Sequence, residues 1–154
     1  MYAKHEAATQ CAKSLLMGCH LEHYQVWSAV MVMSFIRNPR APDLPDRVWV
    51  VASCDLSLAK TNAPEYKPTG TYQEMRRAFI ADAWPAIGHD VTAVSVFTDG
   101  HLVIELESFH LHALRSVDPF EEEWCITSMF PDSLGVAPWN VALSDFGEFE
   151  VRRP

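Results

Sequence analysis

The chain has 154 residues, of which 49% are hydrophobic and 21% are charged, and its formal net charge is −8. This length is typical of one domain, and the apolar content is sufficient for a core, which excludes a chain that is disordered throughout. No run of about eighteen apolar residues occurs, and the N-terminus lacks a basic block followed by an apolar one, so we expect neither a membrane span nor a signal peptide.

Two helices are predicted from apolar residues that recur at helical spacing. The first covers about residues 2–16 and ends before Gly18, because glycine commonly follows a helix. The second covers about residues 71–84, where Thr71 and Glu74 have the spacing of a capping box and Pro85 stops the helix.

Runs of apolar and β-branched residues predict the strands. These segments are residues 20–27, 30–36, 47–58, 91–97, 102–106, 106–114 and 121–129, followed by a hairpin of 139–143 and 149–151. Stretches rich in proline separate several of them and are predicted to be loops. Asp99-Gly100 between two alternating segments is a strong signal for a tight hairpin.

The sequence also contains an internal repeat, in which a residue of the first half corresponds to the residue 70 positions later. The corresponding pairs are Gly18 and Gly88, Leu21 and Val91, Tyr24 and Val94, Val26 and Val96, and Trp27 and Phe97. Self-similarity of this kind predicts a fold built from two similar units.

We therefore expect an α+β fold of one domain, residues 1–154, with a pseudo-repeat of about 17–58 and 87–129. Two similar antiparallel β-meanders are expected to form one curved sheet or two half-sheets, because short connections favour antiparallel neighbours. The two amphipathic helices, about 2–16 and 71–84, are expected to pack on the sheet.

Acidic residues are concentrated near the end of the chain. Between Ser116 and Val151 there is no Lys or Arg, whereas the same stretch holds eight carboxylates. These are Asp118, Glu121, Glu122, Glu123, Asp132, Asp145, Glu148 and Glu150. Direct nucleic-acid binding is not expected, because phosphate contacts require a positive surface, and an acidic face instead suits a basic protein partner.

An aromatic anchor within a charged surface is typical of protein interfaces. Of the five tryptophans, Trp139 follows Pro138 and lies near acidic residues in the sequence, so we predict that it contacts a partner. The alternative is a structural role, in which Trp139 caps the open end of the sheet.

Histidines are the candidate metal ligands. His110 and His112 are two residues apart on a predicted strand, so their imidazoles point to the same face. Further ligands could come from His20, His23, His89 or His101, with His89 and His101 approaching each other across the second hairpin. The alternative is a row of solvated or hydrogen-bonded histidines. Because an HxH pattern is weak evidence on its own, we predict no metal and no cofactor.

Signatures of catalysis are missing from the sequence. Glu105 and Glu107 can share a strand face as an acid/base pair, but the polar face of a half-exposed sheet has the same pattern. There is no GxSxG, P-loop, GxGxxG or HExxH motif, and the four cysteines are far apart and expected to be free thiols. We therefore predict that the chain is not an enzyme.

Two segments of the second meander form a recognisable pattern. They are Gly88-His89-Asp90-Val91-Thr92-Ala93-Val94 and Asp99-Gly100-His101-Leu102-Val103-Ile104. The pattern resembles that of small bacterial proteins encoded beside polymorphic toxins, which include immunity proteins of contact-dependent growth inhibition systems. The resemblance implies a cytoplasmic protein that binds one cognate toxin domain, often a basic nuclease, and blocks its active site.

We therefore predict an immunity- or inhibitor-like binding protein that neutralises a cognate basic toxin domain through an acidic surface. The predicted partner-binding residues are Glu121, Glu122, Glu123, Asp132, Trp139, Asp145 and Glu148. The alternative is a metal-binding protein or enzyme centred on His110 and His112. A third hypothesis is a scaffold that self-associates through exposed sheet edges.

Overall fold

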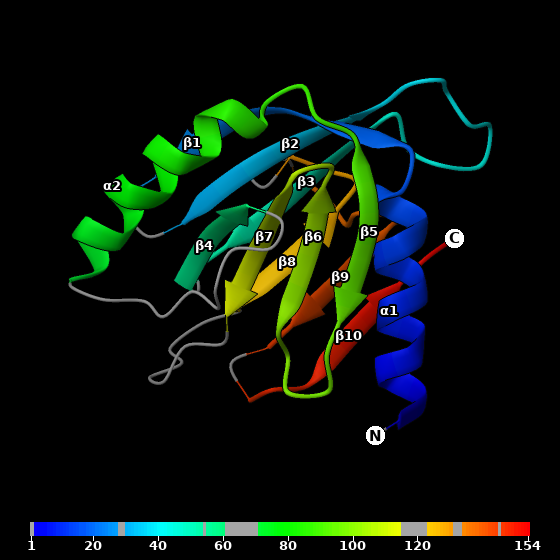
Figure 1. The fold of residues 1–154 in the computed structure, drawn as a ribbon. Helices are drawn as coiled ribbons and strands as arrows, with labels where there is room; N and C mark the ends of the chain where they lie inside the picture. The colour runs from blue at the N-terminus through cyan, green and yellow to red at the C-terminus, as the bar shows by residue number, and fades with distance from the viewer. Residues whose placement is uncertain are drawn as a thin grey trace.

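A computed structural model describes residues 2–27, 30–53, 55–60, 71–114, 123–130, 134–144 and 146–154 of the chain. Its helices (Figure 1) are α1 (Tyr2–Leu16), α2 (Tyr72–Ala83) and the short 3-10 helix η1 (Trp84–Ala86). Its strands are β1 (Cys19–Val26), β2 (Met31–Arg37), β3 (Arg47–Ala52), β4 (Asp55–Lys60), β5 (Val91–Val96), β6 (Leu102–Leu106), β7 (Phe109–Leu114), β8 (Trp124–Thr127), β9 (Asn140–Leu143) and β10 (Phe149–Arg152).

The strands form two antiparallel sheets. The larger sheet has the order β1-β2-β3-β8-β9-β10, and the smaller has the order β4-β7-β6-β5. The smaller sheet lies in front of the larger one in Figure 1, and buried side chains of both sheets form one core. Helix α1 packs against β5 and β10 on one side of the sheets, and α2 packs against β4 on the other side. The predicted α+β fold of two meanders and two helices is confirmed, with the strands divided between two sheets.

Both helices form where local signals predict them. The buried residues of α1 recur at helical spacing: Ala8, Cys11, Ala12, Leu15 and Leu16. A complete capping box starts α2, since Thr71 Oγ accepts a 3.3 Å hydrogen bond from the Glu74 N–H and Glu74 Oε2 accepts a 2.8 Å bond from the Thr71 N–H. Further along α2, Phe79 and Ala83 are buried in the core.

The meanders β1-β2-β3 and β5-β6-β7 share local details. Gly18 and Gly88, which correspond in the repeat, both have positive φ values of 82° and 89°. The first strand of each meander contains a bulge at the corresponding place, after Leu21 in β1 and after Val91 in β5. An antiparallel bridge also joins His20 to Asp90, which are corresponding residues. Such a contact between equivalent positions is what a two-fold relation produces, so the two meanders meet about a local pseudo-two-fold axis.

Residues 47–58 were predicted to form one strand, but they form two strands in different sheets. The chain leaves the larger sheet after Ala52 and enters the smaller sheet at Asp55. At the crossing, the Ser53 N–H donates a 3.1 Å hydrogen bond to the carbonyl of Glu123, just before β8. The apolar pattern did not reveal this break, because both strands are apolar and a change of sheet leaves the local sequence pattern unaltered.

Cys11 and Cys19 are buried free thiols, as predicted, and Cys54 lies outside the described residues. Burial raises the pKa of the Cys11 and Cys19 thiols, so both are poor nucleophiles. Neither α1 nor α2 has the length and apolar composition needed to cross a bilayer, and the described ranges contain no other helix that does.

Candidate functional site

Two hairpin turns meet at one end of the molecule. Trp124 Nε1 donates a 2.8 Å hydrogen bond to the carbonyl of Gly100, in the turn between β5 and β6. Gly100 also packs on Leu143 at the end of β9, so closely that an added Cβ would lie 2.5 Å from Leu143 Cδ2. Because Trp124 and Leu143 are both buried, these contacts hold the two turns in fixed relative positions.

A cavity of about 710 Å³ lies at this end of the molecule, and we call it the end cleft. Its walls come from the N-terminal turn of α1 and from both hairpin turns: Lys4, His5, Thr98, Phe146, Gly147, Glu148 and Phe149. His5 Nε2 lies 2.7 Å from the Val96 carbonyl oxygen, and the His5 ring centroid lies 5.7 Å from that of Phe149. These contacts fix the start of α1 against both sheets, so one wall of the end cleft is preformed.

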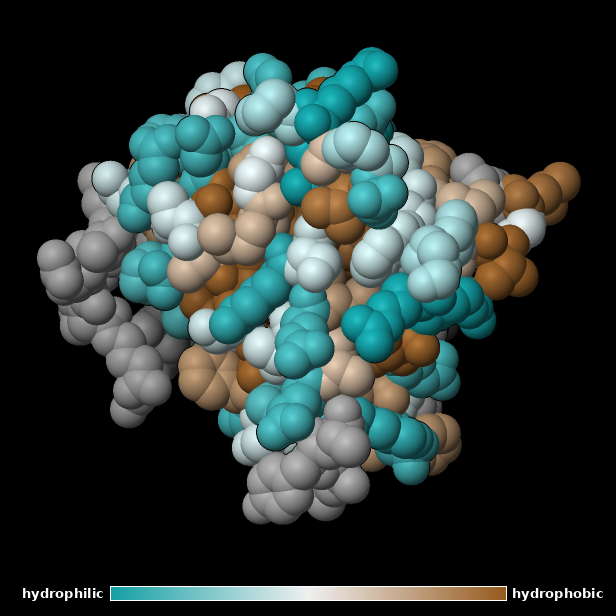
Figure 2. Space-filling model, turned by 90° about the vertical axis from the view of Figure 1, so that its right-hand side faces the viewer, coloured by the Kyte–Doolittle hydropathy of each residue, from teal (hydrophilic) through white to brown (hydrophobic). Residues whose placement is uncertain are grey.

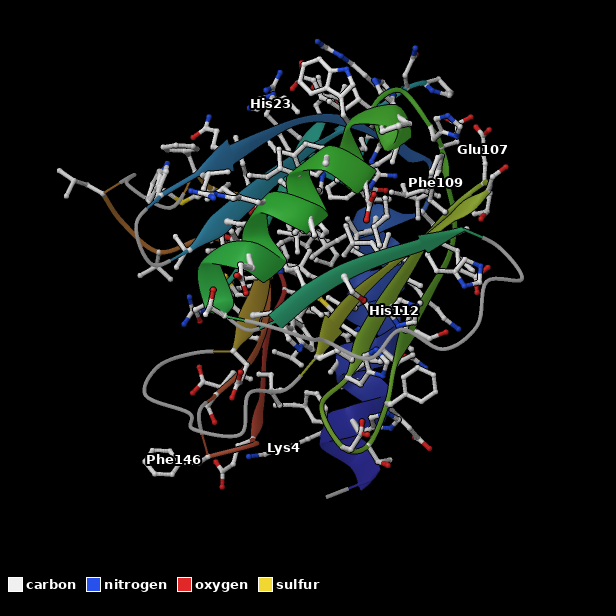
Figure 3. The ribbon with its side chains drawn as sticks, turned by 60° about the vertical axis from the view of Figure 1, so that its left-hand side comes forward. Lys4, His23, Glu107, Phe109, His112 and Phe146 are labelled. Atoms are coloured by element: carbon white, nitrogen blue, oxygen red, sulfur yellow. The ribbon has the colours of Figure 1, made fainter. Side chains whose placement is uncertain are left out.

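The turn between β9 and β10 forms the opposite wall. Ser144 builds this turn, since its N–H donates to the Glu148 carbonyl at 2.9 Å and its own carbonyl accepts from the Gly147 N–H at 2.9 Å. Its Oγ accepts a 3.1 Å hydrogen bond from the Glu148 N–H. Phe146, at the tip, is 85% exposed. Figure 3 shows Phe146 and Lys4 at the same end of the molecule, and both line the end cleft.

Of the predicted acidic contacts, the structure places Glu148 at an exposed position on the end cleft. Glu123 is only 2% exposed, so its carboxylate does not belong to an exposed acidic face as predicted. The reason is that the main chain of Glu123 is hydrogen-bonded to two neighbouring segments. Its N–H donates to the Leu143 carbonyl at 3.0 Å, and its carbonyl accepts from the Ser53 N–H at 3.1 Å. Glu121, Glu122, Asp132 and Asp145 lie outside the described residues.

Trp139 lies away from the end cleft. It is partly buried against the core, and its main chain exchanges hydrogen bonds with Ser128 at 3.1 and 3.2 Å. It precedes Asn140, whereas Phe146 and Glu148 lie at the other end of the β9–β10 hairpin. This position favours the structural role of Trp139. Phe146 was not predicted from the sequence as a contact residue. Its place in a predicted turn could have indicated exposure, because an aromatic residue there has no strand face on which it can be buried.

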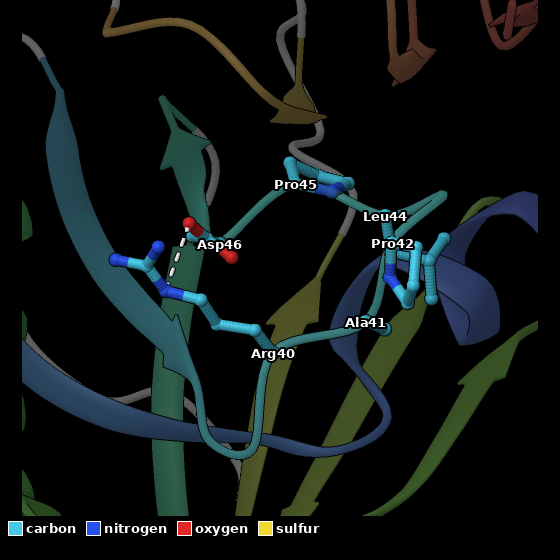
Figure 4. A pocket seen from close by; sticks show the side chains of 6 residues that line it. All are labelled: Arg40, Ala41, Pro42, Leu44, Pro45 and Asp46. Atoms are coloured by element: carbon cyan, nitrogen blue, oxygen red, sulfur yellow. Dashed lines mark ion pairs between the residues drawn. The ribbon is translucent and has the colours of Figure 1, made fainter.

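Two other parts of the described surface offer less for recognition. On the side that carries α1, hydrophilic residues are spread between small apolar areas (Figure 2). A second cavity, of about 460 Å³, lies in the loop between β2 and β3 (Figure 4). Its charged lining residues pair with each other, since Arg40 Nε lies 3.3 Å from Asp46 Oδ2. The two charged groups that line this cavity are therefore already paired with each other.

The histidines of the smaller sheet form a second group. His110 and His112 are both half-buried on the same face of β7, as strand alternation predicts. Nδ1 of His112 lies 3.0 Å from Nε2 of His101, which directly precedes β6. His101 also stacks on Phe97 with a centroid distance of 5.4 Å. Burial lowers the pKa of His101, and the nearby carboxylate of Asp99 opposes this shift.

His89 does not approach His101, so that part of the sequence prediction is wrong. Val91 pairs with Leu106 in the β5–β6 hairpin, which places residues 89 and 101 at opposite ends of it. His89 Nδ1 instead lies 3.3 Å from Glu107 Oε2. Figure 3 shows Glu107 at the end of the sheet that carries Phe109, whose ring packs edge-to-face on His89.

The proposed acid/base pair of Glu105 and Glu107 is not formed on a strand face. Glu105 lies within β6, opposite His110 of β7. Glu107 follows the end of β6 in the β6–β7 turn, with a φ of 50°, and its Oε1 accepts a 3.1 Å hydrogen bond from the Asp90 N–H. The two carboxylates therefore do not lie side by side on one strand face.

Within the described ranges, no three His, Cys, Asp or Glu side chains come together in a way that could hold a metal ion. Comparison of the chain with protein-family models, with curated proteins and with solved structures gives no match. Function is therefore inferred from the residues of the end cleft and from the sequence pattern.

Proposed function

We propose that this chain is an immunity- or inhibitor-like protein that docks a basic toxin domain, for example a nuclease, on its end cleft. The observation that supports this proposal is the turn of Phe146 and Glu148, which presents an aromatic ring and a carboxylate beside the cleft. Both residues are exposed. The turn belongs to the stretch between Ser116 and Val151 that contains no Lys or Arg.

Two interactions suit this turn to a basic partner. The Glu148 carboxylate attracts Lys or Arg and fixes the orientation of the encounter, because opposite charges steer association. The exposed ring of Phe146 can contact the aliphatic stem of the same side chain or its cationic head. Since Ser144 already holds the turn by three hydrogen bonds, little conformational freedom is lost when the partner binds.

Three of the other predicted acidic contacts are sequence neighbours of residues at this end of the molecule. Glu121 and Glu122 directly precede Glu123, whose main chain is bonded to Leu143, and Asp145 lies between Ser144 and Phe146. We include Glu121, Glu122 and Asp145 among the proposed contacts on this ground. Trp139 belongs to the connection between the other ends of β8 and β9, so it is not part of the proposed interface, and Asp132 lies outside the described residues.

The test is binding to a basic domain encoded by a neighbouring reading frame, together with rescue of growth when both proteins are made in one cell. We expect the wild-type chain to bind, to protect the cell, and to lose affinity as salt is added. Phe146→Ala and Glu148→Lys should each weaken binding at least about tenfold, as truncation of an interface anchor does.

Two control variants carry similar changes away from the end cleft. Leu134→Ala removes another exposed apolar side chain, which is 99% exposed, and Asp43→Lys reverses another exposed carboxylate. Both should bind within about twofold of wild type, as surface changes outside an interface do. Wild-type affinity of the Phe146 and Glu148 variants would remove the end cleft from the interface. Failure of the wild-type chain to bind or protect would reject the immunity function itself.

A further inference from the structure

The histidine pair on the smaller sheet has the spacing of two ligands to one metal ion. Nε2 of His101 and Nδ1 of His112 are 3.0 Å apart, and the ring planes are inclined by 32°. His101 directly precedes β6, and His112 lies in the neighbouring strand β7. The register of β6 against β7, in which Leu102 pairs with Ala113, brings them together.

We propose that His101 and His112 bind one divalent transition-metal ion, with Cu²⁺ and Ni²⁺ preferred to Zn²⁺. Imidazole nitrogens bind such ions at about 2.0–2.1 Å. At that length, two nitrogens 3.0 Å apart subtend roughly 90° at the metal. An angle of 90° belongs to the tetragonal geometry of Cu²⁺ and Ni²⁺, whereas Zn²⁺ prefers a tetrahedral site.

In the metal-free protein, the two nitrogens share one proton in a hydrogen bond. When the metal ion binds, this proton moves to the other nitrogen of the ring that carried it, so both rings stay neutral and each gives one lone pair to the metal. The rings must turn so that both lone pairs point to a common position beside the line between the nitrogens. This turn occurs about χ2, which is broad for histidine, so it requires no change in the sheet.

Ser57 supplies a second observation beside this pair. It lies in β4, directly opposite His112, so both side chains are on the same face of the sheet. Ser57 is 2% exposed, and its Oγ is buried without a hydrogen-bond partner among the described residues. A buried hydroxyl in this state is explained by a bound water or ion. The Ser57 hydroxyl is placed to bond a water molecule that completes the metal coordination.

Three other histidines serve as controls. His23 Nδ1 lies 3.2 Å from Glu22 Oε2, and its Nε2 lies 3.3 Å from Gln25 Nε2. His89 is paired with Glu107 on the same sheet but at the far end of the β5–β6 hairpin. His110 shares the face of His112, but its ring centroid is 6.3 Å from that of His112, compared with 5.1 Å for His101.

The experiment titrates the untagged full chain with Cu²⁺, Ni²⁺ and Zn²⁺, each alone, by calorimetry, and records the electron paramagnetic resonance spectrum of the Cu²⁺ complex. We expect one tight equivalent of Cu²⁺ and a tetragonal spectrum with coupling to two nitrogens. Ni²⁺ should bind more tightly than Zn²⁺. His101→Gln and His112→Gln should each lower the affinity at least about tenfold, and Ser57→Ala should lower it less.

The control variants His23→Gln, His89→Gln and His110→Gln should retain wild-type affinity within about threefold, because none of them removes a ligand. Thermal unfolding of each metal-free variant shows whether it is folded, and metal should raise the Tm of the controls by more than that of the His101 and His112 variants. The proposal is overturned if wild type does not bind, if Zn²⁺ binds tightest, or if loss of His110 abolishes binding while loss of His101 does not. Toxin binding by the end cleft is tested separately, so either result can stand without the other.

Discussion

The guanidinium of Arg37 donates a 2.7 Å hydrogen bond to the carbonyl oxygen of Leu15, in the last turn of α1. It also donates to the carbonyls of Met17 at 2.7 Å, Ser14 at 3.2 Å and Pro45 at 3.1 Å. Carbonyls at the end of a helix have no partner inside the helix and carry partial negative charge. The Arg37 side chain of β2 therefore supplies hydrogen-bond donors to the carbonyls at the end of α1. These bonds hold the end of the helix in place where the first meander begins.

Replacement of this cation should destabilise the fold strongly. Arg37 is 5% exposed, so Arg37→Met leaves several buried carbonyls without donors and should lower the free energy of unfolding by about 3 kcal/mol. Arg40→Met is the matched control, because Arg40 is 84% exposed and its ion pair with Asp46 is worth less than about 1 kcal/mol. Urea unfolding of both variants measures the difference. Equal stability of the two variants would mean that the carbonyls find other donors.

The turn at Gly100 should be less tolerant of a side chain than the turn at Gly88. Both residues have positive φ, 92° and 89°, so alanine at either position is strained by about 1–2 kcal/mol. At Gly88 an added Cβ meets nothing within 4 Å, but at Gly100 it meets Leu143 at 2.5 Å. Gly100→Ala should therefore be less stable than Gly88→Ala by about another 1–3 kcal/mol. Chemical denaturation of the pair isolates the steric contribution, and equal losses would show that Leu143 moves aside freely.

Local signals were sufficient to predict the helices, the turns and most strands. The capping box of Thr71 and Glu74 and the Asp99-Gly100 turn depend on a few adjacent residues, so they are readable in one sequence. Pairing between distant strands is different. The change of sheet after Ala52 depends on pairing with β7 and β8, and nothing in residues 47–58 encodes those partners.

The candidate sites were harder to predict for the same reason. Glu123 belongs to a run of three acidic residues, which is usually exposed, but its main-chain bond to Leu143 draws it into the interior. Which aromatic residue is exposed, Phe146 and not Trp139, follows from the tertiary position of each. The proximity of His101 to His112 requires the β6–β7 register, whereas the HxH spacing of His110 and His112 is visible without it.

The hydroxyl group of Tyr24 connects the first meander to the end of α2, and its removal should destabilise the fold. Its OH donates a 2.9 Å hydrogen bond to the Ala83 carbonyl at the end of α2, and its ring packs edge-to-face on Phe79 at 5.9 Å. Burial raises the pKa of Tyr24. Tyr24→Phe should lower the free energy of unfolding by about 1 kcal/mol and speed amide exchange in α2. Tyr24→Ala should lose about 3 kcal/mol or more, because the ring packing is lost too, and equal losses in the two variants would assign no value to the ring packing.

The stability of the fold should fall as the solution is acidified below neutral pH, in part through His101. In the folded state, His112 and Phe97 lie against the ring of His101, and burial lowers its pKa. In the unfolded chain, a histidine side chain has its ordinary pKa of about 6.5. Between about pH 6.5 and the lower pKa of the folded state, the unfolded state binds more protons than the folded state does. The stability that neutral His101 contributes above this range is therefore lost as the pH falls through it. His101→Gln should flatten the dependence of the unfolding free energy on pH. Asp99→Asn, which removes the charge that opposes the shift, should extend the loss to lower pH. A slope in His101→Gln equal to that of wild type would assign the acid sensitivity to other groups.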